Sequence, residues 1–305
     1  MKWLLIALGL LAVILLVVYF WPVPNKDFAE LSDKVDPKTR RALPDFREKH
    51  PEKSVDVDGW EWSYIAMGEG PEAVLFLHGM TGADDIWWQQ MEALAPDYKI
   101  ISVTYPPVGT LEEMSRGVLV VLGAEGVDKT VIVGSSLGGY LTQYLLKTYP
   151  ERVAKAVFAN TFPPNELQAE KNGKLINLLP FLPKWLVMNT FKGSFENRVY
   201  PASGNSELVL AYMLEQIYGR MSKAQITARA KAVIDPFDPP DPEALGIPVM
   251  IIEADNDPLV EPELRAQLKK TYPSAQVQTL HGVGHFPYLN QPEAYTKLLQ
   301  DFLAQ

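Results

Sequence analysis

Short apolar runs alternate along most of the chain with longer segments in which apolar residues recur every three or four positions. The short runs are rich in β-branched residues, which is typical of strands buried on both faces of a sheet. The longer segments, such as residues 111–122 and 137–148, predict amphipathic helices. Strands that alternate with helices indicate an α/β fold with a mostly parallel sheet and helices on both faces. Eight strands are expected, at residues 55–57, 60–64, 74–77, 100–103, 131–133, 155–159, 248–252 and 276–280.

The alternation is interrupted between residues 161 and 245. Two stretches there, residues 175–188 and 206–218, carry many apolar residues, and those of the second follow helical spacing. An insertion of this kind predicts a helical cap over the sheet. Most of its apolar side chains should pack within the cap, while some face a pocket below it and bind the apolar part of a substrate.

The first 21 residues follow another pattern. Residues 3–21 form a run of nineteen residues without a charge, enough for about 28 Å of helix, and aromatic residues lie at both ends. A cleaved signal peptide would have a shorter apolar core followed by small residues, whereas bulky residues follow here. The pattern therefore favours a retained transmembrane anchor. Lys2 precedes the run and Lys26 and Lys34 follow it, so neither membrane orientation is favoured.

Residues 22–53 are rich in proline and charged residues. This composition predicts a juxtamembrane linker with a short helix around residues 39–49. The expected organisation is thus an anchor at 1–21, a linker at 22–53 and a globular domain at 54–305 that includes the cap at 161–245.

Residues 130–150 combine a strand, a sharp turn and a helix around the sequence Gly134-Ser-Ser136-Leu-Gly138. A Gly-x-Ser-x-Gly motif in this context predicts a nucleophile elbow, with Ser136 held out from the edge of the sheet. Side chains at the two flanking positions would clash in so tight a turn, so glycine is needed there. The positive end of the following helix points at the serine, where an oxyanion would form.

Composition narrows the classes of partner and cofactor. A formal net charge of −9 argues against nucleic acid as a partner. The absence of cysteine excludes disulfides, thiolate metal sites and a cysteine nucleophile, and four histidines make a structural zinc site improbable. We therefore expect no metal and no cofactor. The oligomeric state is left open by the sequence.

Four motifs occur in an informative order: His78-Gly79-x-x-Gly82, the serine elbow, Asp255-x-Asp257-Pro-Leu-Val and Gly282-x-Gly-His285. With these motifs the chain resembles the α/β-hydrolase superfamily over residues 55–305. The resemblance is closer to its maspardin-like members, through Tyr105-Pro, Asn160-Thr-Phe, Tyr272-Pro and Phe286-Pro-Tyr-Leu. Maspardin is usually regarded as an adaptor-like relative that lacks the triad histidine, whereas this chain has His285 in that position.

The resemblance implies a catalytic triad and an oxyanion hole. Ser136 would be the nucleophile, His285 the base and Asp257 the acid that orients it. The oxyanion hole would consist of the backbone N–H groups of Met80 and Leu137.

Each partner of the serine has a competitor nearby in the sequence. His281 competes with His285, and we favour His285 because it follows the last strand by a loop within Gly-x-Gly-His. Asp255 competes with Asp257, which directly precedes the Pro-Leu-Val of the family motif. Asp84 and Asp85 are expected to cap a helix over residues 86–94 rather than to take part in chemistry.

These observations predict a serine hydrolase that cleaves a carboxylic ester through an acyl-enzyme. The apolar cap and the anchor favour an amphiphilic or lipid-like ester. Aspartate would be needed at the elbow for haloalkane or epoxide chemistry, but thioesterase, amidase, C–C hydrolase and acyltransferase activities use the same triad. The competing hypothesis is a non-catalytic binding or adaptor protein on a hydrolase scaffold, as the maspardin-like resemblance allows.

Overall fold

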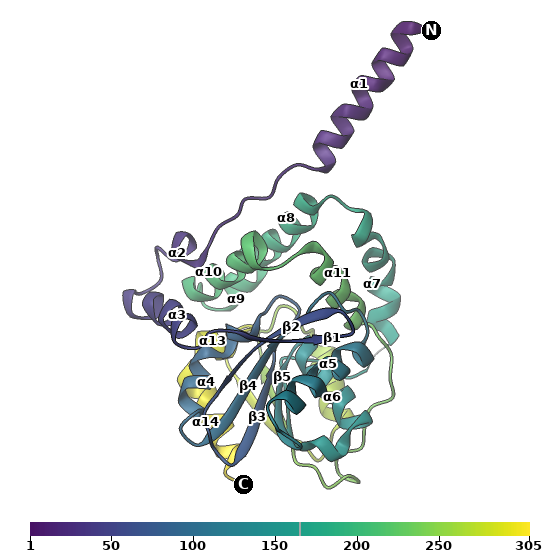
Figure 1. Ribbon diagram of the computed structural model, residues 1–305. Coiled ribbons are helices and arrows are strands. Elements are labelled where there is room, and N and C mark those ends of the chain that lie inside the picture. Colours follow the sequence, from purple (N-terminus) through teal and green to yellow (C-terminus); the bar gives the residue numbers. More distant parts are fainter. Residues whose placement is uncertain (165) are drawn as a thin grey trace.

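An eight-stranded sheet forms the centre of the computed structural model, which describes residues 1–164 and 166–305 (Figure 1). The strand order is β1-β2-β4-β3-β5-β6-β7-β8; β2 pairs antiparallel with β1 and β4, and the other pairs are parallel. The predicted mostly parallel, eight-stranded α/β fold is therefore confirmed. The strands are β1 (Lys53–Val57), β2 (Trp60–Met67), β3 (Glu72–Leu77), β4 (Tyr98–Thr104), β5 (Thr130–Ser135), β6 (Val153–Ala159), β7 (Val249–Ala254) and β8 (Gln276–Leu280).

Helices cover both faces of the sheet because successive side chains of a strand point to opposite faces. Val74 and Phe76 of β3 belong to a core shared with η1 (Asp84–Trp87), α4 (Trp88–Leu94), α13 (Pro287–Asn290) and α14 (Pro292–Leu303). Leu75 and Leu77 pack on the other face with α5 (Leu111–Ala124), α6 (Leu137–Thr148) and α12 (Pro262–Thr271). A short turn, η2 (Pro150–Arg152), leads into β6.

The cap is inserted between β6 and β7, where the alternation of strands and helices is interrupted in the sequence. Part of its apolar surface joins the core, including Val209, Tyr212 and Met213. Asn165, within the predicted cap interval, lies outside the described residues. The cap comprises α7 (Glu166–Leu178), η3 (Leu179–Phe181), α8 (Lys184–Ser194), η4 (Phe195–Val199), α9 (Tyr200–Ala202), α10 (Glu207–Glu215), η5 (Gln216–Arg220) and α11 (Lys223–Ala232).

Helix α1 (Lys2–Tyr19) extends away from the domain on the side of the cap (Figure 1). None of its residues is buried. Among the described residues it is the one helix long and apolar enough to cross a membrane.

Residues 28–49 belong to the folded domain, although the sequence favours a linker. They form α2 (Phe28–Leu31) and α3 (Pro37–Lys49), and the side chains of Phe28, Leu43 and Phe46 are buried in the core. Arg47 of α3 binds both Glu215 of the cap and Asp85 of η1. The predicted linker role therefore does not describe this segment, which ties the cap to the sheet domain.

Candidate active site

Ser136 occupies the turn between β5 and α6 in a strained backbone conformation, with φ 55° and ψ −118°. A positive φ is uncommon for a residue other than glycine and is typical of functional turns. A Cβ atom on Gly134 would lie 2.2 Å from the Gly138 carbonyl oxygen, and one on Gly138 would lie 2.0 Å from that of Leu77. Both flanking positions therefore require glycine, as expected for an elbow.

Asp257 and His285 form a buried pair in the loops that follow β7 and β8. The His285 Nδ1 atom lies 2.8 Å and 2.9 Å from the two carboxylate oxygens of Asp257. The side chain of His285 is 3% exposed and that of Asp257 is 0% exposed, so water does not compete for this contact. The sheet places both residues at the edge where Ser136 also lies, because β5, β6, β7 and β8 are parallel neighbours.

The Asp257 carboxylate has further donors that keep it ionised. Its Oδ1 accepts the backbone N–H groups of Leu259 and Val260, and its Oδ2 accepts the Asn160 side-chain amide at 2.9 Å. Burial opposes ionisation, but the nearby His285 and these hydrogen bonds outweigh it and lower the pKa of Asp257. Asn160 is thus a supporting residue that sequence reasoning did not assign.

Ser136 and the acid pair are connected through the residues after β6. The Ser136 N–H donates to the Ala159 carbonyl, and the next residue, Asn160, donates its side-chain amide to Asp257. Within the described chain no hydrogen bond joins the Ser136 hydroxyl to His285. Such bonds are often long in ligand-free hydrolases and shorten when substrate binds.

The competing pair, Asp255 and His281, lies at the surface. Its carboxylate and imidazole are 2.7 Å apart, and the two side chains are 46% and 79% exposed. Asp255 also accepts the backbone N–H of Gly282, which orders the loop after β8. The two histidines therefore each have their own carboxylate, one pair buried and one exposed.

The loop after β3 lies beside the nucleophile. A Cβ atom on Gly79 would lie 3.2 Å from the Ser136 Cβ. Among the hydrogen bonds of the described residues, none uses the N–H of Met80 or of Leu137 as a donor. These two groups are therefore available to an oxyanion.

Two buried side chains hold this loop in place. The pKa of His78 is well below its ordinary value, first because the ring is buried and second because Arg229 carries a positive charge; the neutral ring contacts the Gly79 carbonyl through Nδ1 at 2.5 Å. Arg229 of α11 donates to the carbonyls of Met80 and Gly82 at 3.0 and 3.1 Å, and to that of Tyr105 at 2.8 Å. Burial lowers the pKa of Arg229 to about 10.

Sequence reasoning missed Arg229. The guanidinium of this cap residue binds two carbonyls of the loop that also carries the Met80 N–H.

The expected capping role of Asp84 and Asp85 is wrong. Neither side chain caps a helix, since neither η1 nor α4 has a side-chain cap. Asp85 instead accepts hydrogen bonds from Arg47, Arg220 and Tyr212. Asp84 is buried, and this burial together with the neighbouring Asp85 raises its pKa well above the ordinary value. Asp85 thus joins η1 to the cap through Tyr212 and Arg220.

Comparison with known proteins shows the family of this chain. The model of the alpha/beta hydrolase family matches residues 74–298, so the chain belongs to that family. Maspardin of Danio rerio is 26% identical over 280 residues, which cover 87% of each chain. A 2-hydroxy-6-oxononadienedioate/2-hydroxy-6-oxononatrienedioate hydrolase of Burkholderia vietnamiensis is 25% identical over 82% of this chain and 94% of its own.

A solved structure shares the fold. The enol-lactonase of Burkholderia xenovorans superposes with a TM-score of 0.70 at 18% identity, over 83% of this chain and 100% of its own. This likeness concerns the fold alone.

Across residues 1–164 and 166–305, no group of three or more His, Cys, Asp or Glu side chains is arranged to hold a metal ion.

Proposed function

We propose that this protein is a serine hydrolase that cleaves a carboxylic ester with Ser136, His285 and Asp257. The observation that carries the proposal is the buried contact between Asp257 and His285 Nδ1. An ionised carboxylate at Nδ1 fixes the proton on that nitrogen and leaves Nε2 free to act as a base. A scaffold that only bound partners would have no physical need for this pair beside a strained serine.

In the proposed reaction, His285 Nε2 takes the hydroxyl proton while Ser136 Oγ attacks the carbonyl carbon of the ester. The resulting oxyanion accepts hydrogen bonds from the N–H groups of Met80 and Leu137. The tetrahedral intermediate then expels the alcohol, which receives the proton from His285, and an acyl-enzyme remains. His285 next removes a proton from water, whose oxygen attacks the acyl carbon. The second tetrahedral intermediate then releases the acid as His285 gives its proton back to Ser136 Oγ.

The proposal includes anchoring of the protein in a membrane by α1. Eighteen residues of helix are about 27 Å long, close to the thickness of a bilayer core, and none of them is buried by the domain. An enzyme held at a bilayer meets substrates that partition into it. We therefore propose an amphiphilic or lipid-like ester as the substrate class.

A second candidate function is supported by the maspardin relatives. On this hypothesis the protein binds a partner and does not catalyse a reaction. The two functions differ in what the Ser136 hydroxyl does, so a substitution that removes only this atom separates them.

The test compares hydrolysis of a short-chain p-nitrophenyl ester by the full chain in detergent and by Ser136→Ala and His285→Ala. Both variants should lose activity while their circular dichroism is unchanged. Ser274→Ala and His281→Ala, at exposed positions, are the matched controls and should retain it. Activity that survives in Ser136→Ala would refute the assignment, and no activity in the wild-type chain with any ester would favour the binding function.

A further inference from the structure

Exposed apolar side chains are concentrated in one stretch of the cap, which we call its apolar face. Beyond residue 21, nine large hydrophobic side chains are exposed among the described residues, and four of these lie within residues 175–186. They are Leu175, Leu178, Phe181 and Leu186, on α7, η3 and α8, and Phe181 is 72% exposed. Isolated exposed hydrophobic residues are normal, but a cluster of this kind marks an interaction surface.

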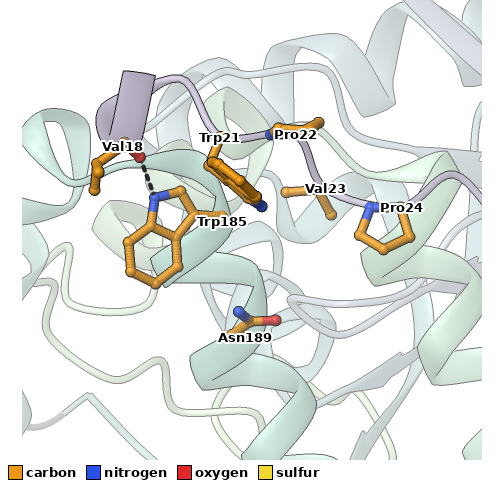
Figure 2. A pocket seen from close by; sticks show the side chains of 7 residues that line it. All are labelled: Val18, Trp21, Pro22, Val23, Pro24, Trp185 and Asn189. Atoms are coloured by element: carbon orange, nitrogen blue, oxygen red, sulfur yellow. Dashed lines mark hydrogen bonds between the residues drawn. The ribbon is translucent and has the colours of Figure 1, made fainter. Parts of the chain in front are cut away.

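This apolar face lies next to the end of α1. The Trp185 Nε1–H donates to the Val18 carbonyl at 2.7 Å, and Figure 2 shows the indole directly below the last turn of α1. Trp21 and the prolines that follow line the same cleft, which has a volume of about 490 Å³. The end of α1 therefore lies beside the start of α8. Phe181 and Leu186 are close to Trp185 in the sequence.

Lysines accompany the apolar face. Lys174 and Lys184 are exposed and form no ion pair with any described residue, although the whole chain carries a formal charge of −9. Lysines beside exposed aromatic and aliphatic residues are typical of surfaces that lie on anionic lipid, where headgroups attract the charges and the acyl boundary takes up the apolar side chains.

We propose that the face formed by Leu175, Leu178, Phe181 and Leu186 lies in the interfacial region of an anionic bilayer that α1 spans. The proposal rests on the proposed membrane anchor. Because α1 ends at Tyr19, the membrane surface is at the level of Tyr19, Trp21 and Trp185, which is the position that aromatic residues prefer. The membrane then covers apolar side chains that the domain leaves exposed.

The same face connects to the candidate active site through aromatic contacts. Helix α8 continues into η4, where the ring centroid of Phe195 lies 6.4 Å from that of Phe286. Phe286 in turn contacts the His285 imidazole edge to face at 5.0 Å. These ring contacts link the helix that carries Leu186 to the loop that carries His285.

The test uses the full chain, which has no cysteine, so that a single introduced cysteine can be labelled with the fluorophore NBD. Three variants are reconstituted in vesicles with anionic lipid and lipids spin-labelled at shallow or deep positions. Phe181→Cys reports on the cap face, Leu11→Cys on the anchor, and Val277→Cys on the exposed edge strand β8 as the matched control. We expect quenching at position 181 by shallow labels, at position 11 by deep labels, and at position 277 by neither.

The outcomes separate the two proposals. Quenching at position 11 without quenching at position 181 would overturn the cap proposal and leave the anchor intact. Absence of quenching at both positions would overturn the anchor and the cap proposal with it, whereas hydrolysis in detergent tests the catalytic assignment independently.

The role of Lys174 and Lys184 is tested separately, in the labelled Phe181→Cys variant. Quenching at position 181 should decrease when neutral lipid replaces anionic lipid, and Lys174→Glu with Lys184→Glu should remove this dependence. Equal quenching in both lipids without the lysine substitutions would overturn the role of the lysines.

Discussion

Replacement of Asp257 by asparagine tests the orientation of the base. Oδ1 of Asp257 accepts the backbone N–H groups of Leu259 and Val260, so the amide oxygen of an asparagine should occupy this position. Its NH₂ group then replaces Oδ2, which is the nearer of the two oxygens to His285 Nδ1, at 2.8 Å against 2.9 Å, and which accepts from the Asn160 amide. Two donors would face the asparagine NH₂ group there.

The conflict is relieved when His285 moves its proton from Nδ1 to Nε2. The histidine then presents an N–H to Ser136 and cannot take the hydroxyl proton. In a serine triad, a wrong tautomer of this kind lowers kcat about 10⁴-fold, which corresponds to ~5.4 kcal/mol of transition-state stabilisation. The unmatched Asn160 amide should also cost about 1–3 kcal/mol of folding free energy.

The control is Asp255→Asn, which makes the same change in the exposed pair with His281. Because solvent can replace either partner there, kcat should stay within about twofold of the wild-type value. Steady-state kinetics on a p-nitrophenyl ester, with urea denaturation to confirm folding, measures both variants. Full activity in Asp257→Asn together with a large loss in Asp255→Asn would show that the acid is Asp255 and refute the tautomer argument.

Three further predictions concern residues around the site. Arg229→Met removes the donor to the Met80 carbonyl and should lower kcat about 10- to 100-fold with little change in KM; an unchanged kcat at saturating ester would contradict a positioning role. Asp84→Asn should be more stable than wild type at pH 7 and similar to it at pH 4. The pKa of Asp84 is raised in the folded protein, so the wild type loses stability as the pH rises from about 3.9 through this raised pKa. Urea denaturation at the two pH values measures the difference in free energy of unfolding between variant and wild type, and an equal difference at both values would contradict this reasoning. Phe46→Ala should lower the free energy of unfolding by about 3–5 kcal/mol, since this ring is buried in the core; a change below ~1 kcal/mol would mean that α3 is not part of the domain.

The elements near Ser136 were predictable because their signals are local. A β-branched run, glycines at fixed offsets and a helical repeat occur within 20 residues of one another, and the structure places β5, the turn and α6 there. The interruption of strand and helix alternation likewise located the cap between β6 and β7.

Arg229 was not predictable, because its partners are distant in sequence. It lies in α11 among other charged and polar residues, and the carbonyls that it binds are 124 to 149 positions away. Nothing in the local pattern distinguishes a buried arginine from an exposed one. The same holds for Asn160, whose partner Asp257 is 97 positions away.

The packing of residues 28–49 was hidden by composition. Leu43 and Phe46 are three positions apart, which is compatible with one face of a helix, but charged residues dominate the rest of α3. Arg47 is one of these charges, and its role becomes visible only with Glu215 and Asp85 beside it. Charge that is neutralised by tertiary contacts cannot be told from solvated charge in the sequence.

The central claim is that Ser136 is an activated nucleophile, and covalent labelling tests it most directly. The full chain in detergent is treated with a fluorophosphonate probe and analysed by intact mass and peptide mapping. We predict one adduct per chain, located on Ser136, absent from Ser136→Ala and strongly reduced in His285→Ala. A folded wild-type chain that remains unlabelled would contradict the account and leave the binding function as the better hypothesis.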